Sequence, residues 1–146
     1  MKLIADLQVH SRFSRATSKH LNLENLEKYA KIKGLNLLGT GDISHPEWLK
    51  ELKQGLTEDD TGILKSKSGF NFVLQGEISN IYTQGGKGRR IHNVILAKNF
   101  EIVQQIQEAL KKKGRIDYDG RPIFGFSCVE LVEMMKGIDE KIEIIP

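Results

Sequence analysis

Short apolar runs alternate along this chain with segments in which apolar residues recur every three or four positions. The first pattern predicts strands and the second predicts amphipathic helices. The predicted strands are 3–10, 35–40, 70–82, 91–97 and 141–145. Predicted helices follow Asn22, Pro46, Asn99 and Ser127, residues that favour helix starts. The segments between them, 11–21, 57–69 and 114–126, are predicted to be loops.

Strands that alternate with helices indicate an α/β layered fold with a mainly parallel sheet, organised as one domain over residues 1–146. Helical spacing places Leu56 on the buried side of the second helix, and Leu131, Val132 and Met135 on the buried side of the last. The final strand stops at Pro146 with nothing after it, which predicts an open sheet edge or a longer parent protein.

The composition limits the class of protein. Hydrophobic residues make up 39% of the 146 positions and charged residues 28%, as in a globular domain. No apolar run reaches the roughly 18 residues of a membrane span, so we expect no membrane partner. Cys128 is the single cysteine, which excludes an intrachain disulfide and favours a cytoplasmic location.

The charge pattern is a weak guide to partners. The net charge of +3 does not by itself imply nucleic acid. Lys87, Arg89 and Arg90 cluster in one glycine-rich turn, where they are either solvated or available to phosphate.

Polar side chains gather where the predicted strands end. In the first strand Asp6, Gln8 and His10 alternate with apolar residues and therefore share one face. Ligands of α/β proteins collect at the carboxyl ends of parallel strands. The candidates there are His10, Asp42, Glu77 and His92, with Gln8 as a weak ligand.

Imidazole and carboxylate groups suit zinc, manganese or iron, and Glu77 could bridge two ions that clamp a phosphate and activate a water. Each residue also has an ordinary structural interpretation: a hydrogen-bonded histidine, a turn aspartate or a solvated glutamate. His20 and His45 are interpreted as surface histidines. The chain shows no serine or cysteine nucleophile with a matched base.

Four motifs carry a resemblance to a known family. Asp6-Leu7-Gln8-Val9-His10-Ser11 resembles the first motif of the polymerase-and-histidinol-phosphatase (PHP) superfamily, Asp-Leu-His-x-His-(Ser/Thr). Gly39-Thr40-Gly41-Asp42, Gly76-Glu77-Ile78-Ser79 and the strand at 90–97 resemble three further motifs. Ser11-Arg12-Phe13-Ser14 and Asp119-Gly120-Arg121-Pro122-Ile123 are similar to the endonuclease Q branch, repair nucleases that cut DNA 5′ to deaminated bases.

The resemblance implies a fold, a site and a partner. The fold would be the N-terminal part of a distorted (β/α)7 barrel. Its cofactors would be divalent zinc, manganese or magnesium ions, and its partner DNA. It implies metal ligands at Gln8, His10, Asp42, Glu77 and His92, with Asp42 and Glu77 also catalytic and Asp6 orienting a ligand. DNA phosphates would be bound by Arg12, Lys87, Arg89 and Arg90.

Two departures from the family pattern limit these expectations. Gln8 stands where the family has its leading histidine, and an amide oxygen is a poorer ligand than imidazole. The family would continue beyond Pro146 into further histidine and aspartate motifs, so the domain is expected to be truncated. We therefore expect a metal-dependent DNA-repair endonuclease lineage with weak or absent activity in this chain.

Two other functions remain open at this stage. One is a non-catalytic module that binds nucleic acid or a protein partner, and the other is a small-molecule phosphatase of the histidinol-phosphate type. A second copy of the chain could cover the open sheet edge.

Overall fold

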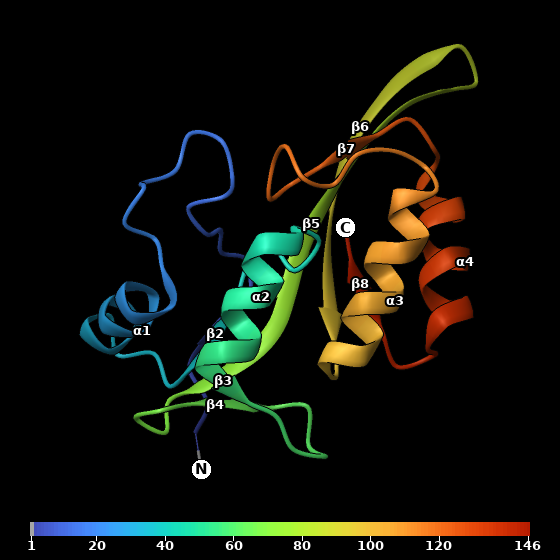
Figure 1. Cartoon of the computed structure of the whole chain (residues 1–146). Coiled ribbons are helices and arrows are strands. Elements are labelled where there is room, and N and C mark those ends of the chain that lie inside the picture. Colours follow the sequence, from blue (N-terminus) through green and yellow to red (C-terminus); the bar gives the residue numbers. More distant parts are fainter. Residues whose placement is uncertain (1) are drawn as a thin grey trace.

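One long strand, β5 (Asn71–Gln84), forms the spine of the fold and pairs with four other strands. We describe residues 2–146 in a computed structural model (Figure 1). The first part of β5 pairs with β2 (Leu37–Gly39) and β4 (Leu64–Ser66), and its longer remainder pairs with β6 (Lys87–Ala97). The other short strands are β1 (Ala5–Asp6), β3 (Leu56–Thr57), β7 (Ile123–Phe124) and β8 (Glu143–Ile145).

The sheet is mixed and open. Parallel pairs join β1 to β2, β2 to β5 and β5 to β7, whereas β3–β4, β4–β5, β5–β6 and β6–β8 are antiparallel. Within the described residues β1 pairs only with β2, and β8 only with β6. The α/β class predicted from the sequence is confirmed, but the prediction of a mainly parallel sheet is wrong. The longest pairing is a hairpin, because a glycine turn at Gly85 and Gly86, both with positive φ, returns the chain directly.

All four predicted helices are present among the described residues. Side chains of Asn22, Asn99 and Ser127 accept a backbone hydrogen bond from the residue three positions on, and Pro46 occupies the first turn of the second helix. The helices are α1 (Leu23–Ile32), α2 (Pro46–Gly55), α3 (Phe100–Lys111) and α4 (Cys128–Ile138).

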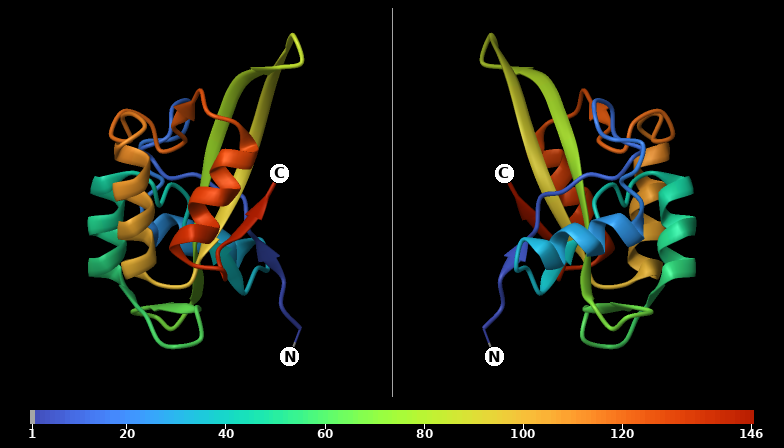
Figure 2. Two further views of the ribbon diagram at one scale, coloured as in Figure 1. Left: turned by 90° about the vertical axis from the view of Figure 1, so that its right-hand side faces the viewer. Right: turned by 90° about the vertical axis from the view of Figure 1, so that its left-hand side faces the viewer.

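The main core lies between the sheet and the helices. Helices α2 and α3 cover the same side of the sheet, and the β5–β6 hairpin extends beyond the rest of the molecule (Figure 2). Trp48 and Leu52 of α2, Val103 and Leu110 of α3, and Phe72 of β5 are fully buried in one cluster. No helix within residues 2–146 is long and apolar enough to cross a membrane.

Three local predictions from the sequence are corrected by the structure. Sheet pairing of the first strand stops at Asp6 and does not reach His10, because residues 7–10 leave the sheet toward the loop that follows. The predicted loops 57–69 and 114–126 contain β4 and β7, which are too short to show periodicity. Leu56 is buried in β3 and not in α2, and Val132 is 41% exposed because α4 turns only one narrow side inward.

The adjacent pair Leu131 and Val132 provides a test of which side of α4 is packed. Leu131→Ala should lower the free energy of unfolding by about 2–5 kcal/mol, because a fully buried side chain leaves a cavity. Val132→Ala should change it by less than about 0.5 kcal/mol. Urea unfolding monitored by circular dichroism measures both, and equal losses would contradict the packing described.

Candidate functional site

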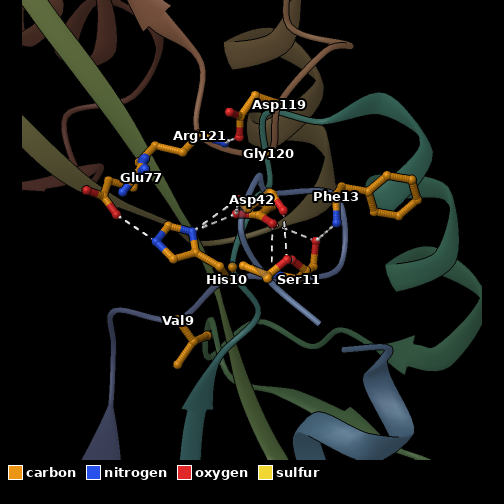
Figure 3. Close-up of polar contacts among 12 residues, drawn as sticks. Val9, His10, Ser11, Phe13, Asp42, Glu77, Asp119, Gly120 and Arg121 are labelled. Atoms are coloured by element: carbon orange, nitrogen blue, oxygen red, sulfur yellow. Dashed lines mark hydrogen bonds and ion pairs between the residues drawn. The ribbon is translucent and has the colours of Figure 1, made fainter. Parts of the chain in front are cut away.

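Four of the residues singled out from the sequence form one connected line of side chains, of which Asp42, His10 and Glu77 are labelled in Figure 3. His10 Nδ1 donates to Asp42 Oδ1 at 3.0 Å, and His10 Nε2 lies 3.0 Å from Glu77 Oε2. On the other side of Glu77, His92 Nδ1 lies 2.6 Å from Oε1. The four side chains therefore follow one another in the order Asp42, His10, Glu77 and His92. They come from three parts of the chain: His10 precedes β2, Asp42 follows it, and Glu77 and His92 belong to the β5–β6 hairpin.

Asp42 is fully buried and its carboxylate is saturated with donors. Oδ2 accepts hydrogen bonds from the Ser11 backbone N–H at 2.7 Å and the Ser11 hydroxyl at 2.6 Å. Oδ1 accepts from the Ser14 hydroxyl at 2.9 Å and from His10 Nδ1. A carboxylate has about four lone-pair positions, so none remains open in this arrangement. Asp42 is thus placed to orient His10, whose Nε2 is directed at Glu77.

A left-handed turn after β2 carries Asp42 to this position. Gly41 and Asp42 have φ values of 69° and 50°, a conformation that glycine and aspartate tolerate best. A Cβ at Gly41 would lie 2.8 Å from the Val9 carbonyl oxygen, so glycine also permits close approach of the first segment. Trp48 Nε1 donates to the carbonyls of Thr40 and Gly41 at 3.2 and 2.9 Å, which fixes the turn to α2.

Gln75 joins the two segments that carry His10 and Asp42. It is fully buried in β5, and its Oε1 accepts from the backbone N–H of Val9 at 3.1 Å and of Gly41 at 3.2 Å. Its own backbone N–H donates to the Thr40 hydroxyl. One amide oxygen therefore sets how closely the first segment approaches the turn after β2.

Gly120 closes the other side of the Asp42 carboxylate. Its N–H donates to the Phe13 carbonyl at 3.0 Å, and its own carbonyl accepts from the Ser44 hydroxyl at 3.2 Å. A Cβ at this position would lie 2.3 Å from Asp42 Cγ and 2.7 Å from the Ser14 hydroxyl. The absence of a side chain here is what allows the 119–121 turn to pack on the buried charge.

Arg121 follows directly and reaches back toward the site. Its side chain extends toward Glu77 (Figure 3), while its backbone N–H donates to Asp119 Oδ1 at 3.0 Å. Within the described residues its guanidinium makes no hydrogen bond or ion pair. It is a free cation beside a buried carboxylate.

Glu77 is ionised although its side chain is only 2% exposed. Burial alone would raise the pKa of Glu77, but the close contacts with His10 and His92 and the charges of His10 and Arg121 outweigh it and hold the pKa at about 2. Oε2 lies close enough to His10 for an ion pair, yet no hydrogen bond of acceptable geometry reaches it among the described residues. This oxygen keeps a lone pair for another ligand.

His10 is correspondingly stabilised in its protonated form. The hydrogen bond to Asp42 is the largest contribution, followed by the close contact with the Glu77 carboxylate, and together they raise the pKa of His10 to about 9 against the opposing effect of burial.

These residues fit a divalent metal by their chemistry. Two imidazoles and the open oxygen of Glu77 are the donors that zinc and manganese accept. As placed, however, the side chains bind one another, and no group of three or more ligands is preassembled in the described chain.

The other predicted site residues lie around this cluster without joining it. Gln8 is exposed and, with His10, lines a cavity of about 500 Å³ beside α1, but the described residues show no hydrogen bond from its side chain. Asp6 accepts a hydrogen bond from the Gln8 N–H at 3.1 Å and makes no hydrogen bond or ion pair with His10 among the described residues. Arg12 is ion-paired with Glu51. Its role, and those of Asp6 and Gln8, stay predictions.

The basic residues of the hairpin, Lys87, Arg89 and Arg90, are exposed near its tip. Of the two histidines interpreted as surface residues, His20 is exposed, but His45 is buried and stacks on Phe13 with ring centroids 4.4 Å apart. Burial is the main reason why the pKa of His45 is lowered. The surface interpretation of His45 is therefore wrong.

Sequence reasoning did not assign Ser11, Ser14, Gln75 or Arg121 to the site. Gln75 could have been noticed, because it is a single amide residue directly after the apolar run Phe72-Val73-Leu74. The two serines and Arg121 gave none outside the family-like motifs, because serine and arginine are ordinary loop residues.

The fold and cluster define an α/β domain with two buried carboxylates paired to partly exposed imidazoles, and comparison with known proteins places it more closely. The structure is similar to the lesion-specific endonuclease Q of Pyrococcus furiosus, with a TM-score of 0.82 and 33% identity. The match covers 96% of this chain and 33% of that one. A structure of endonuclease Q with a 27-mer duplex substrate bearing an abasic lesion at the active site matches to the same extent.

In sequence, the chain is 37% identical over 134 residues to an uncharacterised protein of Methanocaldococcus jannaschii, covering 91% of this chain and 15% of that protein. No protein-family model matches the chain. The chain thus spans about a third of the endonuclease Q chains and a smaller part of the archaeal relative.

Gly120→Ala tests whether the 119–121 turn must contact Asp42. The added methyl group would overlap a saturated buried carboxylate, so we expect a loss of about 1–3 kcal/mol in the free energy of unfolding. Gly137→Ala is the matched control: its methyl group meets no atom within 4 Å, and alanine in α4 should stabilise by about 0.5–1 kcal/mol. Chemical unfolding measures both, and a neutral Gly120→Ala would refute the close packing.

The pH dependence of stability tests the charge state of the cluster in protein treated with a chelator. The His10 pKa is raised from 6.5 to about 9, so its stabilisation is complete below pH 6.5 and is lost as pH rises through 9. The Glu77 pKa is lowered from 4.5 to about 2, so its stabilisation is complete above pH 4.5 and is lost as pH falls through 2. Both contribute fully only between pH 4.5 and 6.5.

Urea unfolding measured from pH 6.5 to above pH 9 should show the alkaline loss in the wild type and in His20→Ala, where an exposed histidine is removed. The loss should be much smaller in His10→Gln. An alkaline limb that is unchanged in His10→Gln would show that another group is responsible.

Proposed function

We propose that this chain is a PHP-type domain, similar to endonuclease Q, that binds divalent metal and acts on the phosphodiester backbone of damaged DNA. The observation that carries the proposal is the contact of His10 Nε2 and His92 Nδ1 with the two oxygens of the buried Glu77. Further support comes from the similar structures, since endonuclease Q is a lesion-specific endonuclease and is known in complex with a duplex substrate. Cleavage 5′ to deaminated bases, the more specific expectation, is part of the proposal.

The proposed ligands are His10, Glu77 and His92, with Asp42 holding the imidazole of His10 in the tautomer that presents Nε2. Bound there, a zinc, manganese or magnesium ion would supply a Lewis acid that activates water and neutralises phosphate charge. The chain's own contributions are fixed by the cluster: Glu77 is ionised at neutral pH, and Asp42 prevents rotation of His10. Arg12 and Arg90 are the proposed phosphate contacts, whereas Lys87 and Arg89 lie closer to the exposed tip of the hairpin.

We further propose that the fold is the N-terminal part of a distorted (β/α)7 barrel. The support is the open sheet: Ala5 to Gln8 at the β1 edge and Ile145 of β8 line one cavity of about 410 Å³. Leu3 and Ile145 are both exposed apolar residues at these edges. A further polypeptide segment or a second copy of the chain would cover them.

A second candidate function, a non-catalytic nucleic-acid-binding module, has its own supporting observation. Gln8 stands where the family that the chain resembles has its leading histidine, next to a cluster whose members pair with one another. Weak or absent cleavage by this chain is therefore expected under both candidates. Metal binding and DNA cleavage, measured separately, distinguish them.

Metal binding is the first test. Equilibrium dialysis with zinc or manganese should show binding by the wild-type chain, and Glu77→Gln and His92→Ala should each weaken it by at least about tenfold. His20→Ala, which removes an exposed histidine outside the cluster, should bind like the wild type. No binding by the wild type, or equal binding by Glu77→Gln, would refute the proposed metal centre.

Restoration of the leading histidine is the second test. Gln8→His should increase the metal content and should increase nicking of duplex DNA that contains uracil or hypoxanthine, because imidazole is a better ligand than an amide. Gln8→Ala is the control and should restore neither. Strong metal-dependent nicking by the unmodified chain would contradict the expected low activity, and metal binding by Gln8→His without nicking would favour the binding module.

A further inference from the structure

The β5–β6 hairpin has two chemically different faces beyond the site. Residues directly opposite in the hairpin share a face, and successive residues alternate. The register pairs Ser79 with His92 and Ile81 with Arg90, so these four side chains lie on one face, together with Glu77 two positions before Ser79. We call this the site-side face.

The opposite face carries the other basic residues. Tyr82 pairs with Arg89, and Gln84 pairs with Lys87. Arg89 and Lys87 are one and three positions from Arg90, so their side chains point to the face opposite that of Arg90. Farther from the hairpin tip on this face, Asn80 donates a hydrogen bond to the Phe126 carbonyl and Asn93 donates one to Cys128 Sγ. The segment that leads into α4 therefore covers this part of the face. The basic cluster predicted from the sequence is therefore divided, and only Arg90 faces the His10–Glu77–His92 cluster.

The site-side face continues across β7. Ile123 pairs with Ser79 in parallel register and therefore points the same way. Ile123 is 51% exposed and Ile81 is 43% exposed, so two large apolar side chains adjoin the site without a covering element. By contrast Phe124, the next residue, faces the other way and is buried.

Two unpaired guanidinium groups border this apolar surface. Arg90 and Arg121 make no ion pair within the described residues, although Arg12, Arg15 and Arg115 do. Arg121 extends from the start of β7 toward Glu77 (Figure 3), and Arg90 lies one row beyond His92. Guanidinium groups beside exposed apolar side chains match a nucleotide, which combines an anionic phosphate with the apolar faces of sugar and base.

We propose that a DNA strand lies along the site-side face, with its phosphates on Arg90 and Arg121 and its sugar and base groups against Ile81 and Ile123. This inference rests on the proposed function and deepens it. It assigns the substrate-positioning residues to the site-side face of the hairpin and to the adjoining β7 segment. Lys87 and Arg89 then lie outside the path of the DNA strand. Arg90 and Arg121 are positioning residues, since they hold substrate next to the cluster and perform no step of the reaction.

Arg90 and Arg89 form a matched pair for the test, because both are exposed neighbours on β6 and differ only in face. Binding of fluorescein-labelled DNA to the 146-residue chain is measured by anisotropy in a chelator, at several salt concentrations. Arg90→Ala and Arg121→Ala should each weaken binding about three- to tenfold and reduce the slope of log affinity against log salt by about 0.9 per lost contact. Arg89→Ala should weaken it less than twofold.

Ile81→Thr separates the apolar contact from charge. Threonine preserves strand propensity, so the hairpin should remain folded, as circular dichroism can confirm. Binding should weaken with no change in the salt slope, since no phosphate contact is lost.

The outcomes distinguish this inference from the proposed function. If DNA binds but Arg89→Ala and Arg90→Ala are equivalent, the site-side face is refuted while the metal centre stands. If the two variants differ but the chain binds no metal, the binding face stands and the metal-dependent function fails. If the wild-type chain binds no DNA at low salt, both are refuted.

Discussion

The buried carboxylate of Asp42 is the constraint on which the candidate site depends. Removing a charge from water costs several kcal/mol unless hydrogen bonds and an opposite charge replace the lost hydration. Here Ser11 supplies two donors, Ser14 one and His10 a cationic imidazole, so all positions on the carboxylate are filled. Loss of one partner would leave an unsatisfied buried charge. The loop that follows β1, the turn after β2 and the 119–121 turn are therefore held in one arrangement.

The remaining half of the cluster is built differently. Glu77 and His92 belong to one hairpin, and their contact follows from its register alone. His10 connects this local pair to the long-range arrangement around Asp42, with Gln75 setting the approach of the two segments. The hairpin thus contributes two proposed ligands at the base of one face and, further out, Arg90 and Ile81, so that site and substrate contact would share one rigid element.

Much of this fold could be predicted from local patterns. Helical spacing and the caps Asn22, Asn99 and Ser127 located the helices, because these signals act within a few residues. The short strands β4 and β7 could not be predicted, since two or three residues carry no period and their pairing with β5 decides their conformation. Val132 illustrates the same limit, because the exposed and buried sides of α4 depend on what packs against it.

For the site, the sequence by itself determined which donors were available: His10, Asp42, Glu77 and His92 were identified from residue type and position. Their metal-binding roles stay predictions. Only the tertiary structure decided that Asp42 is saturated and orients His10, that Glu77 retains an open oxygen, and that Arg121 rather than Arg12 is unpaired near the cluster. The reason is physical: residue types fix what a group can bind, whereas burial and long-range packing decide which partners occupy its lone pairs and which side chains remain free.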